Sequence, residues 1–385
     1  MPDAQYVDQP QALTELCTRL GSAGWLALDT EFMREKTYYP RLCLIQIASI
    51  DAVAVIDPLA LPDLKPVFEL LANPACVKVL HAAGQDLEVL YQAGAPALAP
   101  LFDTQLAAAL LGHGEQIGYA ALVKALLGKE LHKAHTRADW SRRPLDADEL
   151  TYAADDVRYL GPLYAQLNDE LQSTGRKDWL RQETAALADP VNYQPDPQDQ
   201  WQRLRGLHRL APGAQHIAAR LAAWRETTAM RLNRPRKWIL ADEVLTDIAQ
   251  RAPRNLEELQ RLRDMPERTL AQHADAWLEC VRQGLSEAAT PVVAPPQRLS
   301  PEQAPLADLL MSALRQLASA QRISPALLAT RDEIDRLVLG QRDLALLQGW
   351  RGELAGQTLL AALEGQVGFR IANGELRLET LVKSS

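Results

Sequence analysis

The feature that most constrains the fold is a set of four apolar segments of strand length within the first 81 residues. They are WLALDTEF (25–32), LCLIQIAS (42–49), AVAVID (52–57) and CVKVLH (76–81). The segments after them carry apolar residues at helical spacing, and the last, DADELTYAADDVRYLGPLYAQL (146–167), predicts one long helix. Strands followed by interleaved helices predict an α/β domain with a mixed sheet that ends near Ala188.

Two proline-rich polar segments divide the rest of the chain. DPVNYQPDPQDQ (189–200) and SEAATPVVAPPQRLSPEQAP (286–305) have the composition of linkers. Residues 201–284 and 309–381 carry apolar residues at spacings of three and four, which predicts two small all-helical domains. We therefore expect three domains, at residues 1–190, 201–285 and 305–383. The two helical segments are similar in length, but they share too few residues to prove a repeat.

Cysteine usage and hydropathy bear on the compartment. The four cysteines form no CxxC pair and no cluster with histidine, so neither a disulfide framework nor a zinc site is indicated. No basic segment followed by an apolar core opens the chain, and no apolar run approaches the roughly 18 residues of a membrane span. We expect a cytoplasmic protein with no membrane association and no evident obligate protein partner.

Charge is distributed unevenly along the chain. The net charge of −8 argues, taken alone, against a nucleic-acid partner. However, residues 1–190 carry 16 Lys and Arg against 26 Asp and Glu, whereas residues 201–285 carry 15 against 10. The first segment therefore has a net charge of −10 and the second a net charge of +5. This division is expected if one part holds a polyanion while the other concentrates carboxylates that hold cations.

Acidic residues stand where strands and helices are expected to end. Asp29 and Glu31 are two residues apart on a strand, so they project from the same face, and solvent, a proton, a basic side chain or a metal must offset their repulsion. Asp86 follows the fourth strand, and Tyr152 and Asp156 share one helical face. If they converge, the four carboxylates would hold two divalent metals about 4 Å apart, with Mg²⁺ or Mn²⁺ preferred over zinc. Such a pair supports in-line cleavage of a phosphodiester.

At these residues the sequence resembles the ribonuclease D group of DEDD-type 3′→5′ exonucleases. DTEF matches the first motif, HAAGQDLEVL the second, and a tyrosine three residues before the last aspartate matches the third. The resemblance implies a ribonuclease H-like exonuclease domain in which Asp29, Glu31, Asp86 and Asp156 bind the metals. It also implies that Tyr152 orients or helps to deprotonate the attacking water. Since a free phenol has a pKa of about 10, orientation is the favoured role.

The downstream segments carry a second resemblance. WQRLRGLHRL and AAWRETTAMRLNRPRKWILADEVLTDIAQRAP look like an HRDC domain, a helical nucleic-acid-binding module, and residues 306–381 resemble a second, more diverged copy. In the first copy, Arg231, Arg234, Arg236 and Lys237, with Trp238, are expected to contact phosphates and stack on one base.

Several residues near the motifs allow two interpretations. Tyr152 can meet either Asp155 or Asp156, and the family spacing favours Asp156, with Asp155 a surface acid. Asp103, which precedes a helical run, is expected to cap that helix and not to bind metal. Arg142 and Arg143 fit phosphate contacts and solvated loop charges equally well.

The leading hypothesis is a 3′→5′ exoribonuclease that uses two divalent ions to trim structured RNA, with 3′-extended tRNA precursors the substrate that the family implies. One alternative is a 3′→5′ DNA exonuclease of the proofreading or Werner type, since the same chemistry cuts either backbone. The other is a catalytically silent RNA-binding scaffold, which loss of an acid at one of the four positions would have indicated.

Overall fold

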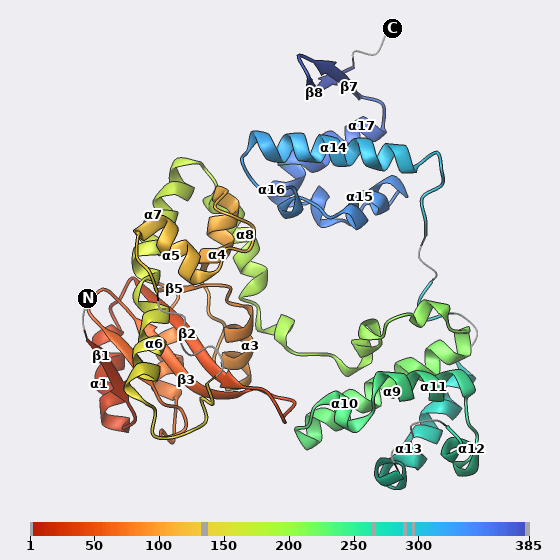
Figure 1. The fold of residues 1–385 in the computed structure, drawn as a ribbon, viewed down its shortest axis with the longest axis horizontal. Coiled ribbons are helices and arrows are strands. Elements are labelled where there is room, and N and C mark those ends of the chain that lie inside the picture. Colours follow the sequence, from red (N-terminus) through yellow and green to blue (C-terminus); the bar gives the residue numbers. More distant parts are fainter. Residues whose placement is uncertain (1–2, 132–137, 263–266, 288–290, 295–296, 382–385) are drawn as a thin grey trace. The chain divides into compact units, whose positions relative to one another are not determined.

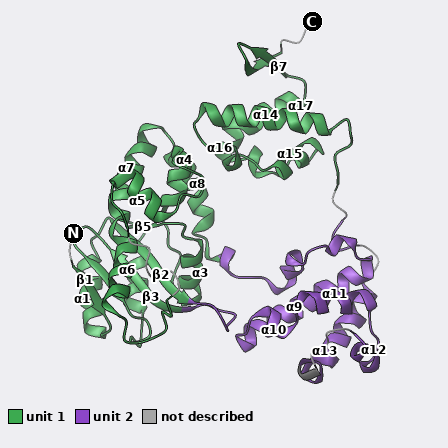
Figure 2. Ribbon diagram, viewed as in Figure 1, with its two compact units in different colours: residues 1–32, 42–190, 297–385 green, residues 33–41, 191–296 purple. Residues whose placement is uncertain are grey.

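The computed structural model of the 385-residue chain describes residues 3–131, 138–262, 267–287, 291–294 and 297–381 (Figure 1). The chain forms two compact units, shown in Figure 2. Unit 1 contains residues 1–32, 42–190 and 297–385, and unit 2 contains residues 33–41 and 191–296. The predicted sheet therefore lies in unit 1, and the basic helical segment lies in unit 2.

Unit 1 is built on a six-stranded sheet with the strand order β1-β4-β3-β2-β5-β6. The strands are β1 (Ala4–Val7), β2 (Trp25–Met33), β3 (Arg41–Ala48), β4 (Val53–Ile56), β5 (Val77–Leu80) and β6 (Leu101–Asp103). β1 pairs with β4, β2 with β5 and β5 with β6 in parallel, whereas β3 and β4 are antiparallel. The predicted mixed sheet is confirmed. β2 lies in its interior, which fixes the strand that carries Asp29 and Glu31.

Helices cover this sheet. They are α1 (Pro10–Leu20), α2 (Lys65–Leu71), α3 (Gly84–Gln92), α4 (Thr104–Leu111), α5 (Tyr119–Leu127), α6 (Ala147–Arg158), α7 (Leu160–Ser173) and α8 (Lys177–Leu187). α6 packs against β4 and β1, α7 against β5, and α8 against β6. α6 begins with a capping box in which Asp146 and Glu149 satisfy each other's backbone N–H groups. This cap sets the start of the helix that carries Tyr152 and Asp156.

One local prediction for this domain is wrong, and two short strands were missed. Residues 146–167 do not form one helix, because α6 ends at Arg158 and α7 begins at Leu160. Pro162 has no N–H to donate to the carbonyl of Arg158, so the proline interrupts the helical ladder at this point. The short edge strands β1 and β6 were not expected, since three or four residues are too few to establish an alternating pattern.

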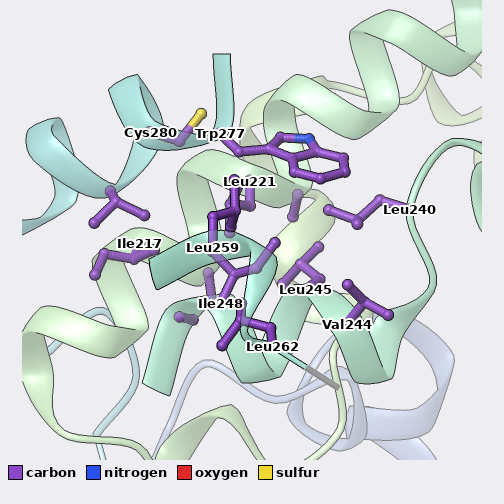
Figure 3. Close-up of a cluster of buried hydrophobic side chains, with 14 of the residues drawn as sticks. Ile217, Leu221, Leu240, Val244, Leu245, Ile248, Leu259, Leu262, Trp277 and Cys280 are labelled. Atoms are coloured by element: carbon purple, nitrogen blue, oxygen red, sulfur yellow. The ribbon is translucent and has the colours of Figure 1, made fainter. Parts of the chain in front are cut away.

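Unit 2 is helical and closes around a buried apolar cluster (Figure 3). After the 3₁₀ helices Pro190–Tyr193, Pro197–Arg203 and Leu207–Arg209 come α9 (Pro212–Leu232), α10 (Arg236–Ile239), α11 (Asp242–Arg251), α12 (Leu256–Gln260) and α13 (Glu267–Ser286). α9 packs against α13 and α11. Leu221, Leu245, Ile248 and Trp277 are fully buried in the cluster, so this segment has a core of its own.

The last part of unit 1 combines helices with a hairpin. It contains α14 (Ala304–Ala320), the 3₁₀ helix Pro325–Leu327, α15 (Arg331–Val338), the 3₁₀ helix Ala345–Leu347, α16 (Gly349–Arg351), the π-helical turn Gly352–Gly356, α17 (Gln357–Leu363), β7 (Val367–Ala372) and β8 (Glu375–Thr380). An all-helical segment up to residue 381 is therefore wrong, and the predicted boundary at 383 lies outside the described residues. Asn373 and Gly374 both have positive φ, the geometry of a two-residue hairpin turn. The Asn-Gly pair was the signal in the sequence.

Candidate active site

The site begins with two carboxylates on β2. Asp29 and Glu31 project from one face of the strand, and Asp156 reaches the same place from α6. One carboxylate oxygen from each of the three lies within 4.8 Å of the others. Among the described residues this is the one group of acidic, histidine or cysteine side chains with metal-binding spacing. Residues 127 positions apart in the sequence thus meet at one site.

Asp86 is placed beside this group by the residue between the two acids of β2. It lies in the first turn of α3 and is buried. Its Oδ1 accepts hydrogen bonds from Thr30 N at 3.1 Å and from Thr30 Oγ1 at 2.6 Å. Thr30 therefore orients Asp86, a role that alternation along DTE did not indicate, because it points Thr30 away from the face of Asp29 and Glu31. Asp86 is not among the three acids within 4.8 Å, but its charge raises the pKa of Asp29.

The metal-free acids are electrostatically strained. Burial first, and then the charges of Asp86, Asp156 and Glu31, raise the pKa of Asp29 well above its usual range. Burial and the neighbouring acids likewise raise the pKa of Glu31 to about 8 and that of Asp156 to about 7. The pKa of Asp86 rises to about 6, mainly through burial. A bound divalent cation would remove this penalty, so the donor set fits hard cations such as Mg²⁺ or Mn²⁺.

Tyr152 lies one helical turn before Asp156. Burial, followed by the charges of Asp156, Glu31 and Asp29, raises the pKa of its phenol. The Trp140 ring stacks on the Tyr152 ring, with centroids 6.1 Å apart and planes at 26°. The hydroxyl is therefore protonated at neutral pH and lies close to the acids.

Two ambiguous acids have structural partners. Asp155 is half-buried and forms an ion pair with Arg158 at 2.8 Å. Asp103 caps α4 by accepting from Gln105 N and Leu106 N, which confirms its predicted role.

Tyr119 was not predicted as a site residue. Its hydroxyl donates to the carbonyl of Asp155 at 2.8 Å and accepts from Tyr159 N at 3.2 Å. It therefore ties α5 to the end of α6, next to Asp156. No local pattern marks such a contact, because its partners lie 36 and 40 residues away.

The arginines considered as phosphate ligands are not all available. Arg143 binds the Asp57 carboxylate and backbone carbonyls, so neither of its two predicted roles holds. In unit 2, Arg236 pairs with the fully buried Glu226, which also accepts from the Tyr38 hydroxyl. Arg236 is therefore a structural residue, and its predicted phosphate contact is wrong. Arg231, Arg234, Lys237 and Trp238 are exposed.

Comparisons with known proteins agree with this geometry. A family model described as 3′-5′ exonuclease matches residues 4–172, and the HRDC domain model matches residues 214–281. Ribonuclease D of Sphingobium indicum is 40% identical over 388 residues, covering 97% of each chain. Ribonuclease D of Acidiphilium cryptum is 40% identical over 375 residues, covering 96% of this chain and 95% of the relative.

Solved structures extend the comparison to the fold. Escherichia coli RNase D, described as an exoribonuclease involved in structured RNA processing, superposes with a TM-score of 0.82 at 31% identity. That match covers 94% of this chain and 99% of the other. Exonucleases of the DEDD type use divalent metals, and the acids around Asp29 fit that requirement. No helix within the described ranges is long and apolar enough to cross a membrane. The similarity along nearly the whole chain shows that this protein belongs to the ribonuclease D family and is a 3′→5′ exoribonuclease.

Proposed function

We propose that this exoribonuclease trims the 3′ ends of structured RNA, such as tRNA precursors with 3′ extensions, using two Mg²⁺ or Mn²⁺ ions. Asp29, Glu31, Asp86 and Asp156 would hold the ions. The observation that carries this proposal is the approach of three carboxylates from β2 and α6 to within 4.8 Å of one another. Such mutually repelling acids are expected where a cation is bound.

The side chains divide the work at the terminal phosphodiester. Bound divalent ions would supply a water of lowered pKa and stabilise charge on the leaving oxygen. Tyr152 keeps its proton at neutral pH, because its pKa is raised. Its hydroxyl would therefore hold the attacking water in line and would not act as the base. Thr30 holds the Asp86 carboxylate by two hydrogen bonds, which fixes the direction of its remaining oxygen.

The test is hydrolysis of a 5′-labelled RNA hairpin with a 3′ extension by the purified protein alone. Activity is expected with Mg²⁺ or Mn²⁺ and not with EDTA. Asp156→Asn should lower the single-turnover rate at least about 100-fold, since loss of one ligand removes several kcal/mol of transition-state stabilisation. Asp155→Asn is the matched control, because the Asp155 carboxylate is adjacent in sequence but pairs with Arg158. It should hydrolyse RNA at nearly the wild-type rate.

Two results would contradict the proposal. A folded wild-type protein that shortens no RNA end would remove its basis. Equal losses in Asp155→Asn and Asp156→Asn would show that the metal-binding acid is misassigned. A matched DNA strand tests the substrate class, and the 2′-hydroxyl is the group that would distinguish the two.

We also propose that the basic helical domain at residues 201–285 contacts RNA, and that residues 1–190 and 305–383 form the exonuclease and a diverged second HRDC domain. Exposed Lys237 and Trp238 would contribute a phosphate contact and a stacking surface.

Lys237→Ala and Trp238→Ala should weaken RNA binding measured in Ca²⁺, whereas Lys65→Ala, at an exposed lysine of the exonuclease domain, should not. Unchanged affinity in both variants would exclude this surface. The free cysteines fit the reducing cytoplasm, where we place the activity.

A further inference from the structure

A short loop before α6 supplies the ring that packs on Tyr152. Trp140 is 4% exposed, and its ring lies over that of Tyr152 at 6.1 Å. The side chain of Tyr152 is thus held by its own helix and by a residue twelve positions earlier. The contacts that fix Trp140 therefore also affect the direction of the Tyr152 hydroxyl.

Arg143 holds this loop through every donor that it has. Its Nε and Nη2 bind the two oxygens of Asp57 at 2.5 and 2.7 Å. Nη2 also donates to the Cys43 carbonyl at 2.9 Å, and Nη1 donates to the carbonyls of Trp140 and Arg142 at 2.8 and 2.7 Å. A guanidinium carries five N–H donors, and all five have acceptors in this arrangement.

The Asp57 carboxylate, which accepts from Arg143, has other hydrogen-bond donors as well. Asp57 follows β4 directly and is 1% exposed. It also accepts from the Tyr6 hydroxyl of β1 and from Leu59 N. Burial alone would raise the pKa of Asp57, but hydrogen bonds from Arg143 and Tyr6 hold it below its usual value. The Arg143–Asp57 ion pair is therefore buried on the Asp57 side and fully hydrogen-bonded, and it connects the loop to β1, β3 and β4.

The neighbouring Arg142 contacts the start of α6, at the other end of the loop. Arg142 Nη2 donates to Asp146 at 2.8 Å and to Glu149 at 3.1 Å, the two residues of the α6 capping box. Its side chain is 50% exposed, and these contacts are made by one guanidinium nitrogen. A lysine can replace such a contact. It cannot replace Arg143, because three donors on one atom cannot reach a carboxylate and three carbonyls at once.

We propose that Arg143 is a positioning residue for RNA hydrolysis, which anchors the Trp140 loop to the sheet and thereby holds Tyr152 against the acids of β2. The proposal rests on the role given above to Tyr152. Arg143 touches neither substrate nor metal in this account. Its contribution to the rate passes through the Trp140 ring and the Tyr152 hydroxyl.

A double-mutant cycle on the full-length protein tests this connection. Tyr152→Phe should lower the single-turnover rate at saturating RNA and Mn²⁺, and Arg143→Lys should lower it roughly 10- to 100-fold, the size expected for misplacement by about 1 Å. KM should change little in either variant. The double variant should be no slower than the slower single variant by more than about twofold, because both changes remove the same contribution. Arg142→Lys is the matched control and should keep the wild-type rate.

The outcomes separate this proposal from the one on which it rests. Losses that multiply in the double variant would show that Arg143 acts independently of Tyr152, and would refute the positioning role alone. A wild-type rate in Arg143→Lys would refute it as well. A wild-type rate in Tyr152→Phe would refute the function assigned to the phenol, and the positioning role with it.

A second variant covers the case in which Arg143→Lys does not fold. Trp140→Phe keeps an apolar ring in the loop and removes part of the stacking surface on Tyr152. Its rate should fall less than that of Arg143→Lys, and the loss should disappear in the Tyr152→Phe background. A loss of equal size in both backgrounds would overturn the proposal.

Discussion

Neutralising Glu31 should stabilise the metal-free protein while destroying its response to metal. The pKa of Glu31 is raised from 4.5 to about 8, first by burial and then by Asp156 and Asp86. Between these values the folded protein keeps a proton that the unfolded chain has lost, so the free energy of unfolding falls as pH rises through this window. Glu31→Gln has no carboxyl group to titrate at position 31, so the part of the decline that Glu31 causes should be absent, while the parts caused by Asp86 and Asp156 remain.

The size of the effect follows from the pKa. One pKa unit corresponds to about 1.4 kcal/mol, so the rise at Glu31 sets an upper limit of about 5 kcal/mol. Solvent reaches part of the side chain and screens the repulsion, and we expect about 2 kcal/mol. Glu31→Gln should therefore gain about 2 kcal/mol over the wild type between pH 5 and pH 8. For a domain of this size, that is a rise in Tm of about 4–8 °C.

Calorimetry in EDTA at pH 5 and pH 8 measures the difference, and a repeat with Mn²⁺ measures the metal response. The wild type should gain stability from Mn²⁺ at pH 8, and Glu31→Gln should gain much less. Exposed Glu35→Gln, four residues away, is the control and should follow the wild type. A Glu31→Gln protein no more stable than the wild type at pH 8 in EDTA would refute the electrostatic account of the site.

Other perturbations test separate parts of the structure. Because Glu31 and Asp156 have pKa values raised to about 8 and 7, Mn²⁺ must displace protons, and its calorimetric affinity should rise from pH 6 to pH 8; a flat profile would contradict this. Lys78→Met should destabilise the protein to urea by about 2–4 kcal/mol, since Nζ donates to three backbone carbonyls in the interior; an unchanged midpoint would show that they find other donors. Arg236→Ala should destabilise unit 2 by about 3–5 kcal/mol, because the buried Glu226 would keep its hydrogen bond from Tyr38 but lose its cation, and thermal melts that match the wild type would argue against that ion pair.

The parts of the structure that sequence could predict are those set by local patterns. Apolar runs of strand length located β2 to β5 within a residue or two, and alternation placed Asp29 and Glu31 on one face. The convergence of Asp86 and Asp156 on that strand was expected from the family resemblance and not from spacing. Spacing alone contains no information on how two distant elements meet.

The missed features depend on pairing across long sequence separations. Arg143 and Asp57 are 86 residues apart, and Tyr38 and Glu226 are 188 apart, so neither partner could be identified from its own segment. A basic run at residues 231–237 looked uniform, yet burial of Glu226 commits Arg236 to an ion pair. In contrast, Pro162 and Asn373-Gly374 carried readable signals for a helix break and a hairpin turn.

The nine residues from Met33 to Arg41 connect β2 to β3, yet they belong to unit 2. There the side chain of Asn233 accepts from the backbone N–H groups of Tyr38 and Tyr39. A protein truncated after residue 190 would consequently lack Asn233, and the backbone N–H groups of Tyr38 and Tyr39 would lose this acceptor. A lower rate in a truncated enzyme would therefore combine two effects, the loss of the helical domain and the loss of the partners of residues 33–41.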